Sequence, residues 1–270
     1  MGEQERRPAG CAALVAAPTP SPFSYPHLLC QVYLRRFQPL LGRWWQTVAA
    51  FTVPSAWEAA YYSASFGLPS ARTSVCHLGS YDVQEHLARI DRRPLGNRQA
   101  PYVFTGGQTD RDYDTFLTAL AGLDVPARLN APARSLGKVG APANVLVQAL
   151  MPREAYFAAV ANATVVAIPL RPVYHAAGLS LLLAAMSVGR PIVCSDTPVT
   201  RDYVTDSQTA LLVPPGDAAA LRAAIARLMT DESLRAELGA NARRRWQEQH
   251  TLASFAAQVD QVLTGVVEGR

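Results

Sequence analysis

The stretch Val165–Pro198, VVAIPLRPVYHAAGLSLLLAAMSVGRPIVCSDTP, decides the expected fold. It begins and ends with short β-branched runs of the kind found in strands that are buried on both faces. Between these runs, small residues lead through Gly178 into an apolar helix. Doubly wound sheets bind ligands at strand–loop–helix junctions of this kind. We therefore expect a ligand site at the loop His175–Gly178.

Strands and helices alternate regularly on both sides of this stretch, which predicts a parallel sheet covered by helices on both faces. The other expected strands are Tyr102–Thr105, Val125–Leu129, Asn144–Val147 and Ala210–Val213. The expected helix starts are Thr109/Asp110, Pro152, Asp217, Asp231 and Thr251. The fold class is thus α/β, with a Rossmann-like doubly wound parallel sheet.

A shorter strand–helix–strand unit, residues 47–79, precedes the main sheet. Its strands are expected at Thr47–Val53 and Arg72–His77, and Ser55 and Gly67 are expected to cap the two ends of its helix. Glu58, three residues after Ser55, is the expected capping-box partner. Polar residues Tyr81–Gln99 predict a linker. The expected domains are a poorly ordered segment at 1–26, a small incomplete α/β piece at 27–90, and the Rossmann-like domain at 91–270.

Residues 28–45 interleave large apolar side chains with Arg35, Arg36 and Arg43. This pattern suits a helix that packs on a core, and it also suits a helix that lies on an anionic membrane surface. Peripheral contact with the inner membrane face therefore stays an alternative for this segment.

The composition is that of a globular protein, with 49% hydrophobic residues and a net charge of +4 in 270 residues. No apolar run approaches the roughly 20 residues of a membrane span, and no block of basic residues indicates nucleic-acid binding. The four cysteines show neither disulfide nor zinc spacing, so we expect a cytoplasmic protein without a metal. The G-x-G-x-x-G fingerprint of nicotinamide enzymes is absent.

Two loops have the composition of phosphate-binding loops. Gly106-Gly107 allows close approach of the backbone to a ligand, and Arg111 follows it with a side chain suited to phosphate. Ala176–Gly178 leads into the N-terminus of a helix, where Ser180 adds a hydroxyl. Each signal has a structural alternative: a tight turn for the glycines, an aspartate partner for Arg111, and a packing role for His175.

Three phrases, taken in order, resemble a known family. They are YVFTGGQTDRDYDTFLTAL, the stretch from Val165 onward with its Ala-Met-x-x-Gly-x-Pro-Ile-Val, and TALLVPPGDAAALRAAIARLMTDESLRAELGANAR. Over about residues 100–265 the chain resembles the donor-binding half of GT-B glycosyltransferases of family 4, group 1. Residues 47–79 resemble the last strand–helix–strand of that family's acceptor domain, which implies that residues 27–90 are a remnant of a truncated acceptor domain.

The resemblance implies a nucleotide-diphospho-sugar donor, no cofactor, no metal, and an acceptor that is a sugar, a lipid-linked sugar or another small molecule. It assigns residues to the donor by position, and it assigns no catalytic residue. The diphosphate and sugar side would be formed by Gly106, Gly107, Arg111, His175, Ala176, Ala177, Gly178 and Ser180. The nucleobase and ribose side would be formed by Ala149, Leu150, Met151 and Ala184.

The chain departs from the family pattern at two positions. Family members commonly carry two glutamates, separated by seven residues, that contact the donor sugar and the ribose, and the matching positions here are Ala176 and Ala184. Two functions are therefore expected: a glycosyltransferase, and alternatively a non-catalytic module that binds a nucleotide-sugar or a partner chain.

Overall fold

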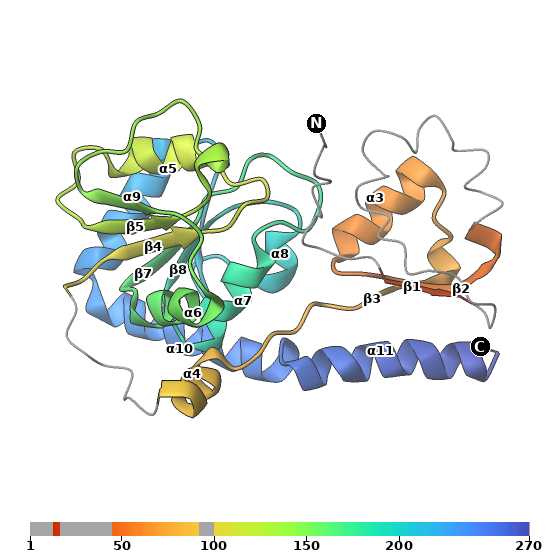
Figure 1. The fold of residues 1–270 in the computed structure, drawn as a ribbon. Helices are drawn as coiled ribbons and strands as arrows, with labels where there is room; N and C mark the ends of the chain where they lie inside the picture. The colour runs from red at the N-terminus through yellow and green to blue at the C-terminus, as the bar shows by residue number, and fades with distance from the viewer. Residues whose placement is uncertain (1–12, 17–44, 92–99, 270) are drawn as a thin grey trace.

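The computed structural model describes residues 13–16, 45–91 and 100–269, which form a larger and a smaller α/β unit (Figure 1). The larger unit is built on a six-stranded sheet, and all of its strands are parallel. In spatial order the strands are β6 (Val145–Gln148), β5 (Ala127–Asn130), β4 (Val103–Gly106), β7 (Val165–Ile168), β8 (Ile192–Ser195) and β9 (Leu211–Val213).

The order of the strands reverses between β4 and β7. From β4 the chain moves outward through β5 to β6, and it then returns to place β7 on the other side of β4. Crossovers that leave in opposite directions open a crevice at the carboxyl ends of the two central strands. The predicted Rossmann-like sheet is therefore confirmed, and its topological switch point lies between β4 and β7.

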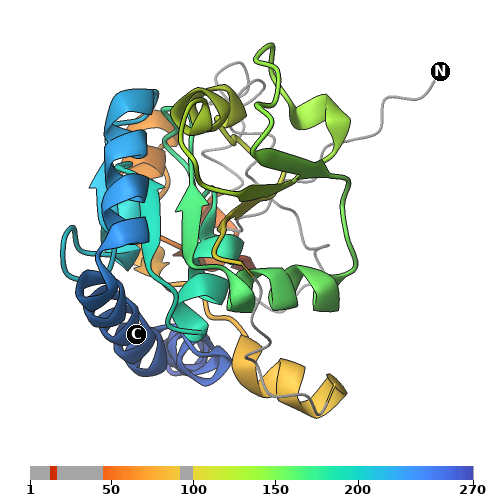
Figure 2. The same cartoon turned by 90° about the vertical axis from the view of Figure 1, so that its left-hand side faces the viewer.

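The central strands are buried on both faces, as their uninterrupted apolar sequences predict. All four residues of β7 are buried, and they alternate between the two cores. Val165 and Ala167 pack with α5 (Tyr113–Leu120) and α9 (Ala218–Thr230). Val166 and Ile168 pack on the opposite face with α6 (Arg153–Asn162), α7 (Leu179–Ser187) and α10 (Glu232–Gln249). Figure 2 shows helices on both sides of the sheet.

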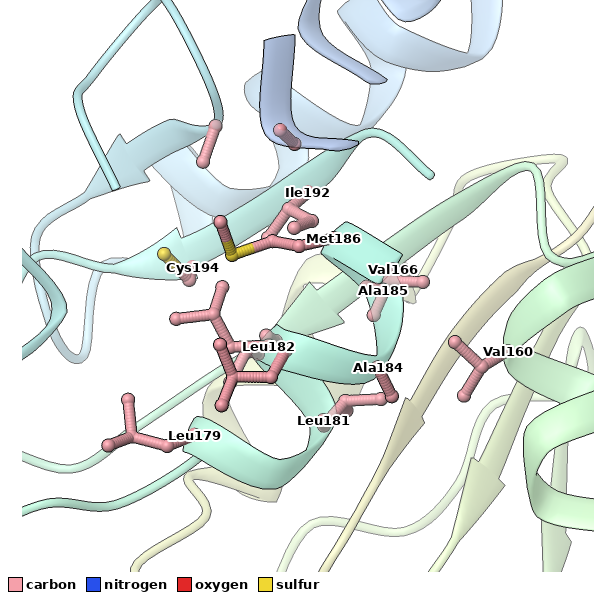
Figure 3. Close-up of a cluster of buried hydrophobic side chains, with 14 of the residues drawn as sticks. Val160, Val166, Leu179, Leu181, Leu182, Ala184, Ala185, Met186, Ile192 and Cys194 are labelled. Carbon is pink, nitrogen blue, oxygen red and sulfur yellow. The ribbon is translucent and has the colours of Figure 1, made fainter. Parts of the chain in front are cut away.

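Helix α7 lies at the centre of the second core. Every residue of this helix except Ser180 is buried, because α7 packs against the sheet on one side and against α10 on the other. Figure 3 shows Leu182 and Met186 among the side chains of β7 and β8. The predicted strand–loop–helix–strand of Val165–Pro198 is confirmed.

The expected helix caps are confirmed at Asp217, Asp231 and Thr251, whose side chains accept hydrogen bonds from first-turn amides of α9, α10 and α11 (Leu252–Val267). The expected cap of α5 is wrong. Asp112, rather than Thr109 or Asp110, accepts from the Thr115 amide. Asp110 has φ of 51° and turns its carboxylate toward another loop.

The smaller unit contains β2 (Val48–Val53), α3 (Ala56–Phe66) and β3 (Thr73–Val75), and the 3₁₀ turn Ser70–Arg72 precedes β3. This is the expected strand–helix–strand unit, and its strands β2 and β3 pair in parallel. Ser55 caps α3, and Gly67 ends it. Within the predicted poorly ordered segment 1–26, the structure describes only β1 (Ala13–Ala16), which pairs with β2 in antiparallel register. Apart from Trp45, the predicted helix 28–45 lies outside the described residues.

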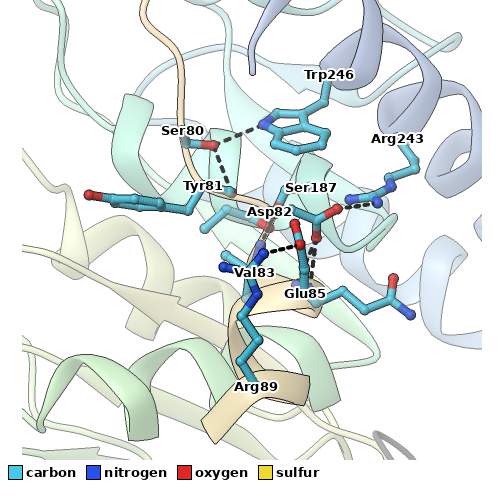
Figure 4. Close-up of polar contacts among 11 residues, drawn as sticks. Ser80, Tyr81, Asp82, Val83, Glu85, Arg89, Ser187, Arg243 and Trp246 are labelled. Atoms are coloured by element: carbon cyan, nitrogen blue, oxygen red, sulfur yellow. Dashed lines mark hydrogen bonds and ion pairs between the residues drawn. The ribbon is translucent and has the colours of Figure 1, made fainter. Parts of the chain in front are cut away.

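The predicted linker Tyr81–Gln99 is wrong in its first half, because α4 (Val83–Asp91) is a helix that packs against α6 and α7. Val83 and Leu87 are buried in the core of the larger unit. Figure 4 shows how the start of the helix is held: Asp82 pairs with Arg243 at 2.5 Å, and the Trp246 indole donates to Ser80. The polar composition of this helix concealed its two apolar anchors.

Helix α11 connects the two units. It leaves α10 and runs beneath the three-stranded sheet of the smaller unit, where it contacts β2 (Figure 1). The His77 amide donates to the Gln258 side chain at 2.9 Å. Among the helices in the described ranges, none has the length and hydropathy needed to cross a membrane.

Candidate donor site

The turn after β4 is closed by the guanidinium of Arg111. This side chain is only 7% exposed, and it donates from Nε to Gly106 O and from Nη1 to Thr109 O, each at 3.0 Å. Gly107 has φ of 118°, and a Cβ there would lie 2.7 Å from Arg111 Nη2. Only glycine fits this position, because the backbone conformation and the guanidinium both exclude a side chain.

Two tyrosines support the same turn. The Tyr113 hydroxyl donates to Gly107 O at 2.7 Å, and burial raises the pKa of that phenol. A Cβ on Gly106 would lie 2.8 Å from the ring of Tyr156, and burial raises the pKa of Tyr156 to about 12. Both phenols are therefore neutral hydrogen-bonding groups at physiological pH.

Arg111 also reaches the loop that follows β7. We call residues Tyr174–Gly178 the donor loop. A Cβ built on Gly178 would lie 3.4 Å from Arg111 Nη1 and 3.0 Å from the Ile168 side chain. Gly178 has φ of 81° and is the N-cap of α7. The guanidinium thus lies between the two loops that flank the switch point, next to the positive end of the α7 dipole.

Further contacts join these two loops. The Asp112 amide donates to Pro169 O, and the Arg171 amide donates to Asp110 O, both at 3.0 Å. The His175 ring pairs through Nε2 with the Asp110 carboxylate at 2.7 Å. His175 is buried, so its ring is a packed partner of Asp110 in this structure. Sequence reasoning left the role of His175 open and assigned Asp110 to a helix cap.

The expected nucleobase side, Ala149–Met151, follows β6. Asn130, at the end of β5, donates from its amide to Ala149 O at 2.5 Å and fixes the start of this segment. Leu150 is 50% exposed. An exposed apolar side chain of this kind suits contact with a flat base.

The predicted donor residues divide into reachable and buried groups. Gly107, Gly178 and Ser180 are at least partly exposed, as are the three residues Ala149–Met151. The methyl groups of Ala176, Ala177 and Ala184 are buried in the apolar core, and Figure 3 shows Ala184 within it. Those three alanines therefore support the loop and the helix by packing in the core. Among the described residues, no cluster of acidic, histidine and cysteine side chains could hold a metal ion.

Sequence reasoning missed one residue next to the donor loop. Glu58 was expected to be the capping-box partner of Ser55, and its carboxylate also accepts from the Ala176 amide at 3.0 Å. Glu58 and Ala176 are 118 positions apart, and no local pattern reports such a contact. The only signal in the sequence was a charged residue among alanines and aromatic residues in the segment AWEAAYY.

Residues 111–245, half of the chain, match the family model described as Glycosyl transferases group 1. The chain belongs to this glycosyltransferase family. The match begins at Arg111 and includes the donor loop, α7 and most of α10. The larger unit is therefore the Rossmann-like half of a GT-B fold, as the sequence phrases indicated.

Solved structures agree on the fold. Anabaena Alr3699/HepE, in complex with UDP, superposes with a TM-score of 0.70 at 16% identity over 93% of this chain and 71% of that one. Sucrose-phosphate synthase from Thermosynechococcus elongatus superposes with a TM-score of 0.65 at 20% identity, over 81% of this chain and 58% of that one. A glycosyltransferase from Rickettsia africae superposes with a TM-score of 0.67 at 10% identity, over 81% of this chain and 64% of that one.

These identities establish a shared fold and nothing finer. The chain spans only 58% and 64% of two of the glycosyltransferase-fold structures it resembles. No curated protein matches the sequence.

Proposed function

We propose that this chain binds a nucleoside-diphosphate sugar in the crevice between β4 and β7 and transfers the sugar to an acceptor. The proposal rests on one observation: the Arg111 guanidinium lies between Gly107 and Gly178, at the switch point of a group 1 glycosyltransferase sheet. The complex of HepE with UDP-glucose supports a uridine nucleotide as the first donor to test.

The chemistry of sugar transfer requires charge stabilisation on the leaving diphosphate. When the glycosidic bond to the donor phosphate breaks, negative charge grows on the phosphate oxygens. The fixed positive charge of Arg111 and the N-terminal amides of α7 stabilise that negative charge. The two loops need little rearrangement during the reaction, because they are already hydrogen-bonded to each other. In this proposal transfer needs no metal ion, and the acceptor is a sugar, a lipid-linked sugar or another small molecule.

A non-catalytic module that binds a nucleotide-sugar is the second candidate. It is favoured by the buried methyl groups of Ala176 and Ala184, the positions at which the family commonly carries glutamates. An alanine accepts no hydroxyl hydrogen bond and stabilises no developing positive charge. This candidate predicts donor binding without release or transfer of the sugar.

Titration calorimetry with UDP, GDP and ADP, in the presence of EDTA, tests donor binding. Ser180 is exposed in the first turn of α7, and Ser233 is exposed in the first turn of α10, so they form a matched pair. Ser180→Ala is expected to weaken nucleotide binding severalfold, because one neutral hydrogen bond contributes about 0.5–1.5 kcal/mol. Ser233→Ala is expected to change nothing.

Failure of all three nucleotides to bind at millimolar concentration would refute the proposal. Where a nucleotide binds, incubation with the corresponding radiolabelled nucleotide-sugars and a panel of acceptors separates the two candidates. Transfer of label supports the transferase, and binding without transfer or hydrolysis supports the module.

A further inference from the structure

Helix α3 carries a buried carboxylate that hydrogen-bonds to the backbone of the donor loop. Glu58 has no exposed surface. Its Oε1 accepts from the Ala176 amide at 3.0 Å and from the Tyr62 hydroxyl at 3.2 Å, and its Oε2 accepts from the Ser55 hydroxyl at 3.0 Å. The carboxylate thus links the smaller unit to the backbone of the loop that follows β7.

This arrangement exceeds what the helix cap requires. The Ser55 hydroxyl accepts from the Glu58 amide as the N-cap of α3, and the Glu58 carboxylate adds a bond to a loop outside the helix. Burial of a carboxylate is costly, and burial raises the pKa of Glu58. The hydrogen bonds from Ala176, Ser55 and Tyr62, together with the nearby charge of His175, oppose that rise. The free-energy cost of burying the carboxylate is therefore offset mainly by the hydrogen bonds that it accepts from these groups.

Aromatic rings join the same two segments a second time. Tyr174, the first residue of the donor loop, stacks on Trp57 with centroids 6.1 Å apart and on Tyr61 with centroids 6.3 Å apart. Trp57 and Tyr61 are one helical turn apart on α3. The loop consequently contacts α3 through both a side chain and a backbone amide.

The opposite side of the loop has little freedom to adjust. His175 is held by Asp110, and Gly178 leaves no room for a Cβ against Ile168. Ala176 lies between these two points, two residues before the N-cap of α7. A shift of its amide would therefore change the direction in which the first turn of α7 presents its N–H groups.

We propose that Glu58 is a positioning residue for the donor: from α3 it fixes the Ala176 amide, and it thereby sets the loop conformation that receives the diphosphate. This inference rests on the proposed function of the crevice. It makes donor affinity depend on the smaller unit, whose Glu58 acts through the backbone of Ala176.

The test compares three variants with the wild type. Glu58→Ala removes the acceptor and leaves the buried Ala176 amide without it. Glu58→Gln keeps a carbonyl oxygen at the same distance. Asp202→Ala is the matched control, because Asp202 accepts from the Ala56 amide at 2.6 Å and fastens the same end of α3 without touching the donor loop.

Calorimetry with UDP, GDP and ADP is run at a temperature at which every variant is folded. Glu58→Ala is expected to bind the preferred nucleotide about tenfold more weakly, in line with the loss of one hydrogen bond to a charged group. Glu58→Gln and Asp202→Ala are expected to bind within about twofold of the wild type, since both keep an acceptor for the Ala176 amide. If Glu58→Ala does not fold, Glu58→Asp replaces it, because its shorter side chain cannot reach that amide.

Amide hydrogen exchange supplies a readout without nucleotide. Exchange in the peptide covering Tyr174–Gly178 is expected to be faster in Glu58→Ala than in Asp202→Ala. The inference is overturned if Glu58→Ala binds as tightly as the wild type, or if Asp202→Ala loses as much affinity. A wild-type chain that binds none of UDP, GDP and ADP would instead refute the proposed function itself.

Discussion

One buried histidine should make the stability of this fold depend on pH. His250 follows α10, has no exposed surface, and stacks on Tyr203 with ring centroids 5.0 Å apart. Burial lowers the pKa of His250 to about 4 from an ordinary value of 6.5, and the charges of His77 and Arg245 act in the same direction. The Leu78 backbone opposes the shift weakly.

The sign of the effect follows from which state binds the proton. In the unfolded chain the imidazole is protonated as the pH falls through 6.5, whereas in the folded chain it stays neutral down to about 4. As the pH falls through this window, the free energy of unfolding therefore decreases, and above or below the window this group causes no further change with pH. At about 1.4 kcal/mol per pH unit, the full window corresponds to about 3 kcal/mol.

Urea unfolding at several pH values between 7 and 4, followed by tryptophan fluorescence, measures this term. His250→Phe keeps an aromatic ring against Tyr203 and cannot titrate. Its stability relative to the wild type at pH 7 gives the packing difference, and on going to pH 4 the variant should gain about 3 kcal/mol relative to the wild type. A stability difference that stays constant from pH 7 to pH 4 would refute the reasoning.

Three further substitutions have expected outcomes. Gly107→Ala places a Cβ at φ of 118° and 2.7 Å from the Arg111 guanidinium, so it should cost about 1–3 kcal/mol of stability and weaken nucleotide binding, as measured by urea unfolding and calorimetry. Leu182→Ala empties space in the core around α7 and should cost about 2–5 kcal/mol in the same unfolding assay. Asn144→Ala removes an amide that donates to three loop carbonyls, at Leu120, Leu123 and Val125, and should lower the melting temperature measured by circular dichroism.

Local patterns predicted the fold well where one signal decided the structure. The uninterrupted apolar run of β7 and the capping aspartates Asp217 and Asp231 are each explained by neighbours in the sequence, and each was placed correctly. Helix α4 was missed because only Val83 and Leu87 anchor it, which is too few apolar residues to stand out from a polar segment.

The candidate site was predictable only in outline. The glycine turn and the start of α7 could be located because Gly107 follows the end of a strand and Gly178 precedes a helix, and glycine is the residue that adopts the positive φ found at both. The burial of Ala176 and the role of Glu58 depend on contacts between segments more than a hundred residues apart. Such contacts arise from the arrangement of the two units, which no sequence window contains.

Chemical-shift mapping of the backbone amides during titration with UDP or GDP tests the central claim most directly. The account predicts that the perturbed amides cluster at Gly107, Gly178–Leu181 and Ala149–Met151, the segments that border the crevice between β4 and β7. No perturbation at millimolar nucleotide, or perturbation centred on a distant surface such as the first turn of α10, would contradict it.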